Sequence, residues 1–157
     1  MRWLNARVGS DTPQREADRF EPREWEEYFG GLTPEQRRAA SARLCRRVIG
    51  DAALPVEAIE QAIAALTDGQ HGRALLEAVQ AVAERSEGEY ESLVGDDESK
   101  LGGSDPVVAA AFVRARAATA LLCALQGVLC CMAYEGWFVL NDLDEVRRLV
   151  GMPRPKP

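Results

Sequence analysis

Histidine is almost missing from this chain of 157 residues, in which His71 is the only one. The sequence also lacks the G-x-S-x-G, H-E-x-x-H, G-x-G-x-x-G and Walker patterns that mark hydrolases, zinc proteases and nucleotide-binding enzymes. A histidine that acts as a general base needs a nucleophile and an orienting acid beside it, and only Asp68 lies near His71 in the sequence. We therefore assign no catalytic residue and no cofactor, and we favour a role without catalysis.

The four cysteines form no ligand or disulfide pattern. Cys45 stands alone, Cys123 precedes the adjacent pair Cys130 and Cys131, and no C-x-x-C spacing occurs. Structural zinc sites usually show such pairs, so we expect no metal site. Cys45 and Cys123 are expected to be small buried apolar side chains. The cysteine pattern and the lack of an apolar leader over residues 1–20 favour a reducing, cytoplasmic location.

Lysine occurs only at Lys100 and Lys156, whereas arginine is abundant, a bias typical of proteins from GC-rich bacterial genomes. The net charge of −6 is uneven, because residues 51–104 carry 12 acidic and 3 basic groups. This surplus of negative charge disfavours nucleic acid as a partner, since phosphate binding needs clustered Lys and Arg. Two interpretations remain: acidic residues that keep a small protein dispersed, or an acidic surface that docks a basic protein.

Strand patterns are scarce as well, and residues 136–140 are the only short candidate. Apolar residues instead recur at helical spacing, which predicts an all-α, single-domain bundle of about five to seven helices. The expected helices cover about 22–29, 34–49, 55–66, 72–85, a short stretch after Ser86, 106–134 and a stretch after Asp142. The bundle is expected to span residues 21–152, between a partly ordered segment 1–20 and a disordered tail 153–157.

Capping residues and glycines set these boundaries. Thr33 with Gln36, and Ser86 with Glu89, match the capping box, in which two side chains satisfy the free N–H groups at a helix start. Gly136 is expected to interrupt the chain after the 106–134 helix.

The longest uncharged run is AATALLCALQGVLCCMAY, residues 117–134. Its length just reaches that of a membrane span, but many of its residues are small, and Gln126 and Gly127 lie near its centre. A helix that is apolar on all sides is also what the centre of a bundle requires. We therefore predict a buried central helix over about 106–134 and no membrane association. Two alternatives are a membrane span or membrane-surface segment, and an apolar ligand pocket beside this helix.

Arg114 and Arg116 lie within this predicted helix, about 200° apart around its axis. A helix buried on most sides cannot expose both, so one of them has to extend to solvent or meet a carboxylate. Glutamates between residues 84 and 91 are the expected partners. An ion pair or, alternatively, an anion site is therefore predicted at Arg114 and Arg116.

These observations favour a protein-binding module of the adaptor, inhibitor or immunity type that uses an acidic surface to bind a protein partner. The residues expected to bind that partner are Glu87, Glu89, Tyr90, Glu91, Asp96 and Asp97. Two alternatives remain open. The first is a small-molecule sensor or enzyme with a pocket beside the 106–134 helix, near Arg114, Arg116, Cys130 and Cys131. The second is a structural homodimer, whose interface candidates are Trp3, Trp25, Trp137 and Phe138.

Overall fold

The computed structural model describes residues 19–50, 52–54, 56–100 and 105–156. Within these ranges the chain forms helices and no strand. The helices are α1 (Pro22–Gly30), α2 (Pro34–Gly50), α3 (Val56–Asp68), α4 (Arg73–Val94), α5 (Pro106–Leu125), α6 (Leu129–Leu140) and α7 (Leu143–Val150), with a 3-10 turn at Glu98–Lys100. The predicted all-α bundle is confirmed. The N-terminal residues expected to be partly ordered lie largely outside the described ranges.

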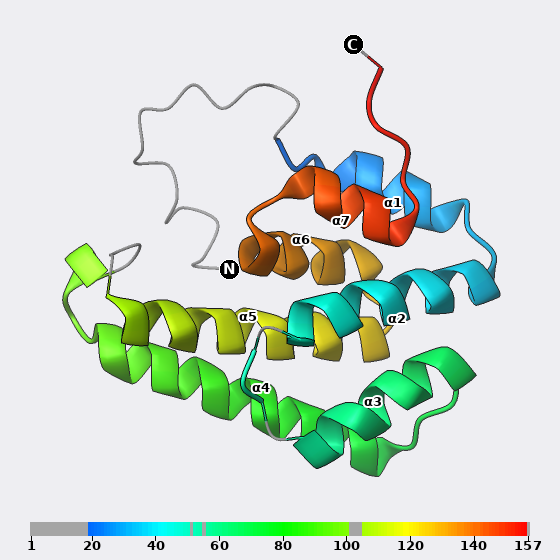
Figure 1. The fold of residues 1–157 in the computed structure, drawn as a ribbon. Helices are drawn as coiled ribbons and strands as arrows, with labels where there is room; N and C mark the ends of the chain where they lie inside the picture. Colours follow the sequence, from blue (N-terminus) through cyan, green and yellow to red (C-terminus); the bar gives the residue numbers. More distant parts are fainter. Residues whose placement is uncertain (1–18, 51, 55, 101–104, 157) are drawn as a thin grey trace.

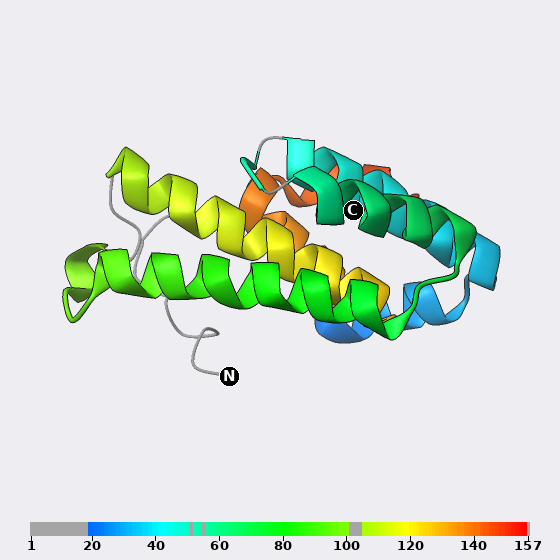
Figure 2. The same ribbon diagram turned by 90° about the horizontal axis from the view of Figure 1, so that it is seen from below.

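The apolar helix α5 lies at the centre of the bundle (Figures 1 and 2). It contacts α2, α3, α4 and α6. Helix α4 runs antiparallel beside it, while α1 and α7 lie further out and pack against α6. The central position predicted for this part of the chain is therefore correct.

The predicted helix over 106–134 is in fact two helices, because the chain turns at Gln126, Gly127 and Val128. Gly127 has a φ of 75°, a left-handed conformation that glycine adopts without steric cost. The N–H groups of Gln126 and Gly127 donate to carbonyls of α5, so the backbone itself closes the helix end. Helix α6 then folds back along α5 (Figure 1).

The interruption expected at Gly136 does not occur, since α6 continues through this residue to Leu140. A Cβ atom at Gly136 would lie 3.3 Å from both terminal methyl carbons of Leu44 on α2. The missing side chain therefore lets α6 approach α2 closely instead of ending the helix. Residues 136–140, the strand candidate, belong to α6.

One of the two predicted capping boxes is present. Thr33 Oγ1 accepts from the Gln36 N–H at 3.2 Å, and Gln36 Oε1 accepts from the Thr33 N–H at 2.9 Å. The second prediction is wrong, because Ser86 is buried inside α4, which runs unbroken from Arg73 to Val94. A single long helix therefore replaces the two shorter helices expected here.

The buried apolar side chains form two clusters. The larger one fills the bundle and includes Trp25, Leu44, Leu121 and Met132. The smaller one lies between α4 and α5 alone and consists of Tyr90, Val94, Val108, Ala111 and Ala115. It marks the part of the α4–α5 pair that extends past the other helices (Figure 2). We call residues 86–94 and 106–115 the distal hairpin.

Helix α5 is long and apolar enough to cross a membrane, as judged by length and composition. In the structure, 56% of its most apolar 18-residue window is buried by the rest of the chain. Core helices of soluble proteins pass the same length and composition test, so this helix is only a weak sign of a membrane span.

Candidate functional site

Four of the carboxylates expected to bind a partner are exposed. Glu89 and Glu91 lie in the last turns of α4, and Asp96 and Asp97 lie just beyond its end. Asp97 accepts hydrogen bonds from the hydroxyl and the N–H of Ser99 at 2.5 and 3.1 Å, and these bonds lower the pKa of the Asp97 carboxyl. We call these four carboxylates the acidic edge.

The two other expected partner-binding residues lie beneath this surface. Tyr90 is 4% exposed, and its ring packs against Phe112 at a centroid distance of 5.4 Å. Burial raises the pKa of the Tyr90 hydroxyl. Glu87 is half-buried and forms an ion pair with Arg116. Tyr90 therefore does not serve as a surface anchor in this conformation, and Glu87 is already engaged.

The distal hairpin instead exposes two large apolar side chains that the sequence pattern did not single out. Leu93 on α4 is 38% exposed, and Val107 on α5 is 59% exposed. Each precedes a valine, Val94 or Val108, that is buried in the small cluster of the hairpin. Both therefore lie at the free end of the hairpin.

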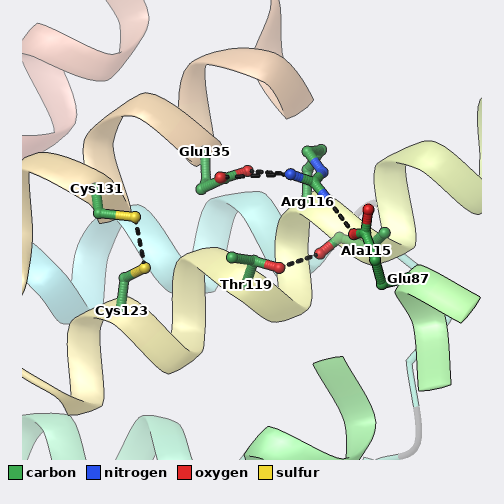
Figure 3. Close-up of polar contacts among 7 residues, drawn as sticks. All are labelled: Glu87, Ala115, Arg116, Thr119, Cys123, Cys131 and Glu135. Carbon is green, nitrogen blue, oxygen red and sulfur yellow. Dashed lines mark hydrogen bonds and ion pairs between the residues drawn. The ribbon is translucent and has the colours of Figure 1, made fainter. Parts of the chain in front are cut away.

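A buried ion-pair cluster joins α4, α5 and α6 at the base of the distal hairpin (Figure 3). The Arg116 guanidinium lies between Glu87 and Glu135: its Nη1 is 3.1 Å from Glu135 Oε2, and its Nη2 contacts Glu87 Oε2. The Arg116 and Glu135 side chains are 8% and 10% exposed. Burial raises the pKa of Glu135, an effect that the Arg116 charge opposes and the Glu87 charge reinforces. Two carboxylates thus share one guanidinium.

Arg114, two residues earlier on α5, turns toward the rim. Its side chain is 28% exposed, and its Nη2 lies 3.9 Å from Glu89 Oε2. The separation of the two arginines around the helix axis explains this difference, because only one of them can face α6. The structure places both arginines beside carboxylates of α4.

The thiols of Cys123 and Cys131 are in contact between α5 and α6 (Figure 3). Cys123 Sγ donates a hydrogen bond to Cys131 Sγ over 2.7 Å. This bond lowers the pKa of Cys131, and together with burial it raises the pKa of Cys123. In one continuous helix the two residues would be about 12 Å apart along the axis. The pair therefore arises from the turn at residues 126–128 that sequence reasoning missed.

The other two thiols lie in apolar or backbone surroundings. Cys45 is fully buried in the main core, and burial raises the pKa of its thiol to about 12. Cys130 Sγ is 3.6 Å from the Pro22 carbonyl oxygen, to which it donates, and burial raises its pKa to about 11. These two thiols are therefore poor nucleophiles compared with Cys131.

A surface hollow of about 460 Å³ lies around α7, lined mainly by charged side chains between Asp142 and Arg154. None of the residues that line it belongs to α5, so this hollow does not support the alternative of a pocket beside the central helix. Among the described residues, no group of three or more His, Cys, Asp or Glu side chains is placed to hold a metal ion.

No known protein family, curated protein or solved structure matches the chain. Function therefore has to be inferred from the arrangement of the residues. Three features offer a starting point: the acidic edge with Leu93 and Val107, the ion-pair cluster around Arg116, and the Cys123–Cys131 thiol pair.

Proposed function

We propose that the chain is a non-catalytic protein-binding module of the adaptor, inhibitor or immunity type, which binds a basic protein with its distal hairpin. The observation that carries this proposal is the exposure of Leu93 (38%) and Val107 (59%) at the end that also bears the acidic edge. Covering such side chains on binding is favourable, by about 1.5–3 kcal/mol for full burial of a Leu or Val. The hairpin thus combines apolar anchors with negative charge.

The acidic edge determines which charge the binding surface of the partner should carry. Residues 84–97 hold six carboxylates and one arginine. Exposed carboxylates attract an oppositely charged protein and repel acidic competitors, and the same charges repel nucleic acid. The complementary partner surface is therefore a basic patch with an apolar centre.

The ion-pair cluster supports this surface from beneath. Glu87 of α4, Arg116 of α5 and Glu135 of α6 link the three helices at the base of the hairpin. A surface carried by helices that are already fixed loses less conformational entropy on binding than a loop does. The cluster has a structural role in this proposal, not a catalytic one.

A cytoplasmic location is part of the same proposal. All four cysteines are free thiols in the structure, which suits a reducing compartment. The burial of α5 by neighbouring helices favours a soluble protein over a membrane-bound one.

Capture of the partner at two salt concentrations tests the proposal. The tagged chain is used as bait in a lysate of the cells that express it, washed at low and at high salt, and the captured proteins are identified by mass spectrometry. We expect one stoichiometric basic protein that is lost at high salt, because salt screens exposed charges. Capture of nucleic acid alone, or a homodimer that holds no other protein, would contradict the proposal.

Matched variants then locate the surface by titration with the captured protein. Glu89→Gln with Glu91→Gln should weaken binding by about tenfold, which is 1.4 kcal/mol. Leu93→Ser should weaken it by about fivefold, or about 1 kcal/mol, because binding can cover only the 38% of Leu93 that is exposed in the free chain. The control is Glu57→Gln with Glu60→Gln, which removes the same charge from exposed positions on α3. Equal affinities for all variants would rule out the distal hairpin.

A further inference from the structure

The Cys123–Cys131 pair is held in register by the turn between α5 and α6. Cys123 lies in the last turn of α5, and Cys131 is the third residue of α6. The N–H of Val128 donates to the Cys123 carbonyl oxygen at 2.9 Å, which fixes the start of α6 against the end of α5. The turn therefore brings the two side chains together, and their sulfurs are in contact.

The two thiols have unequal electrostatic surroundings. Cys131 lies in the first turn of α6, where no side chain caps the helix and the free N–H groups stabilise negative charge. Cys123 lies at the carboxyl end of α5, where the helix dipole has the opposite effect. These helix ends favour a lower pKa for Cys131 than for Cys123, while burial and the Glu135 charge oppose this effect at Cys131.

We propose that Cys123 and Cys131 form a redox site that reduces a small hydroperoxide, with Cys131 as the nucleophile and Cys123 as the resolving thiol. Cys131 is half-buried between two helices, and Cys123 is 7% exposed. Because Cys131 is only partly buried, its sulfur is more accessible to a small oxidant than to the disulfide of another folded protein. The site lies in the bundle core, apart from the acidic edge, and it adds a redox activity to the binding role proposed for the distal hairpin.

The reaction takes place in two steps. The Cys131 thiolate, having released its proton to solvent, attacks the terminal oxygen of the hydroperoxide ROOH. An S–O bond forms, the O–O bond breaks, and the leaving RO⁻ takes up a proton to give ROH. Cys123 sulfur then attacks the sulfenic acid at Cys131, an S–S bond forms, and water leaves with the Cys123 proton. The two sulfurs lose two electrons in total, and the peroxide bond gains them.

Little movement is needed for the second step. The two sulfurs are already in contact, so the roughly 2.05 Å bond of a disulfide forms without rearrangement of the helices. A thiol reductant returns the pair to its reduced state by exchange. Cys130, beside Cys131 in the same turn of α6, donates to the Pro22 carbonyl instead, so it is a natural internal control.

Stoichiometric oxidation tests the proposal. The reduced chain is mixed with one equivalent of hydrogen peroxide and then unfolded, so that its remaining thiols, including the buried Cys45, can be alkylated. Mass spectrometry then counts and locates the modified residues. We expect the loss of two reactive thiols and a peptide that links Cys123 to Cys131, with Cys45 and Cys130 still alkylated. Absence of this linkage, or oxidation of Cys130 as fast as Cys131, would overturn the proposal.

Three variants assign the roles. Cys131→Ser should slow peroxide consumption by at least about tenfold, because it removes the thiolate. Cys123→Ala, which keeps the position apolar, should let sulfenic acid accumulate at Cys131, where dimedone traps it. Cys130→Ser should react at the wild-type rate. Melting temperatures verify that each variant is folded.

Two further measurements separate a folded site from intrinsic cysteine reactivity. In urea the wild-type chain should oxidise Cys130 and Cys131 at similar rates, because unfolding removes the helix termini and the Cys123 contact. Equal selectivity in the folded and unfolded chains would overturn the proposal. Faster oxidation by a small aromatic disulfide than by hydrogen peroxide, at equal concentrations, would overturn the assignment of hydroperoxide as the substrate class.

Discussion

Two buried arginines tie the bundle together in different ways. Arg147 of α7 is 2% exposed, bonds to one carboxylate, Glu24 of α1, at 3.1 Å, and lies 5.4 Å from the ring centre of Trp25. Arg116 of α5 is 8% exposed and bonds to two carboxylates, those of Glu87 and Glu135. The first contact region is electrically balanced, whereas the second holds a surplus negative charge.

The exposure of the carboxylates separates the two regions further. Glu24 is 40% exposed, so water can solvate it if its arginine is removed. Glu135 is 10% and Glu87 24% exposed, so water solvates them far less. The free energy cost of breaking each contact is therefore set by where the acids lie, since both arginines are buried.

Replacement of the two arginines tests this comparison most strongly. Arg116→Met should lower the free energy of unfolding by about 3–5 kcal/mol, because it leaves two carboxylates buried and close together. Arg147→Met should cost about 1–3 kcal/mol, the range for loss of a charged hydrogen bond whose partner can be rehydrated. Urea unfolding of both variants measures the difference. Adding Glu135→Gln to Arg116→Met should recover part of the loss, and equal costs for the two arginines would contradict the comparison.

The pH dependence of stability sharpens the comparison. The pKa of Glu135 is raised in the folded chain, so the folded state binds more protons than the unfolded state in the window that begins near the ordinary value of 4.5. The contribution of Glu135 to stability therefore declines as pH rises through this window. Relative to wild type, Glu135→Gln should gain stability across the same window, measured by urea unfolding at several pH values.

Asp97 provides a control of opposite sign for this measurement. Its pKa is lowered by hydrogen bonds from Ser99, so its contribution is present above the ordinary value of 3.8 and is lost as pH falls through the folded value. Asp97→Asn should therefore have a lower free energy of unfolding than wild type mainly at higher pH, and the difference should shrink as the solution is acidified. If the stabilities of the two variants shifted in the same direction with pH, the raised pKa of Glu135 would not be the cause of the change in Glu135→Gln.

The smallest effect is expected at Arg114, which shares α5 with Arg116. Arg114→Gln should change the free energy of unfolding by about 0–1 kcal/mol, because its contact with Glu89 is long and partly exposed. The same urea titration measures it, and high salt should leave the difference near zero. A cost as large as that of Arg116→Met would show that burial does not separate the two arginines.

The all-α class and most of the helices were predictable, because apolar spacing and caps such as Thr33 with Gln36 are local signals. The glycines were misassigned, since composition does not distinguish two uses of glycine. Gly127 ends a helix through its positive φ, while Gly136 allows close contact with Leu44. The helix start predicted at Ser86 was also wrong, because its capping pattern lies inside a helix that tertiary packing keeps continuous.

The candidate sites depended on these boundaries. Tyr90 faces inward against α5 rather than toward a partner, and Leu93 is exposed in its place, because packing of α4 on α5 decides which side of α4 is buried. The contact of Cys123 with Cys131 depends on a turn that the uncharged run conceals. The acidic composition predicted where exposed carboxylates lie. The apolar anchors and the thiol pair could not be predicted in this way, because they depend on how the helices pack together.

The division of the core into two clusters has a consequence for hydrogen exchange. The small cluster between α4 and α5 buries few side chains, whereas the main cluster is shared by all seven described α-helices. Local opening costs less free energy where fewer apolar contacts are lost, so the chain should contain two cooperative units of unequal protection. Amides near Tyr90 and Val108 should exchange by fraying of the hairpin, while those near Val79 and Leu121 should exchange only when the whole bundle unfolds. Occupation of the hairpin by a partner would then appear as slower exchange in the first set alone.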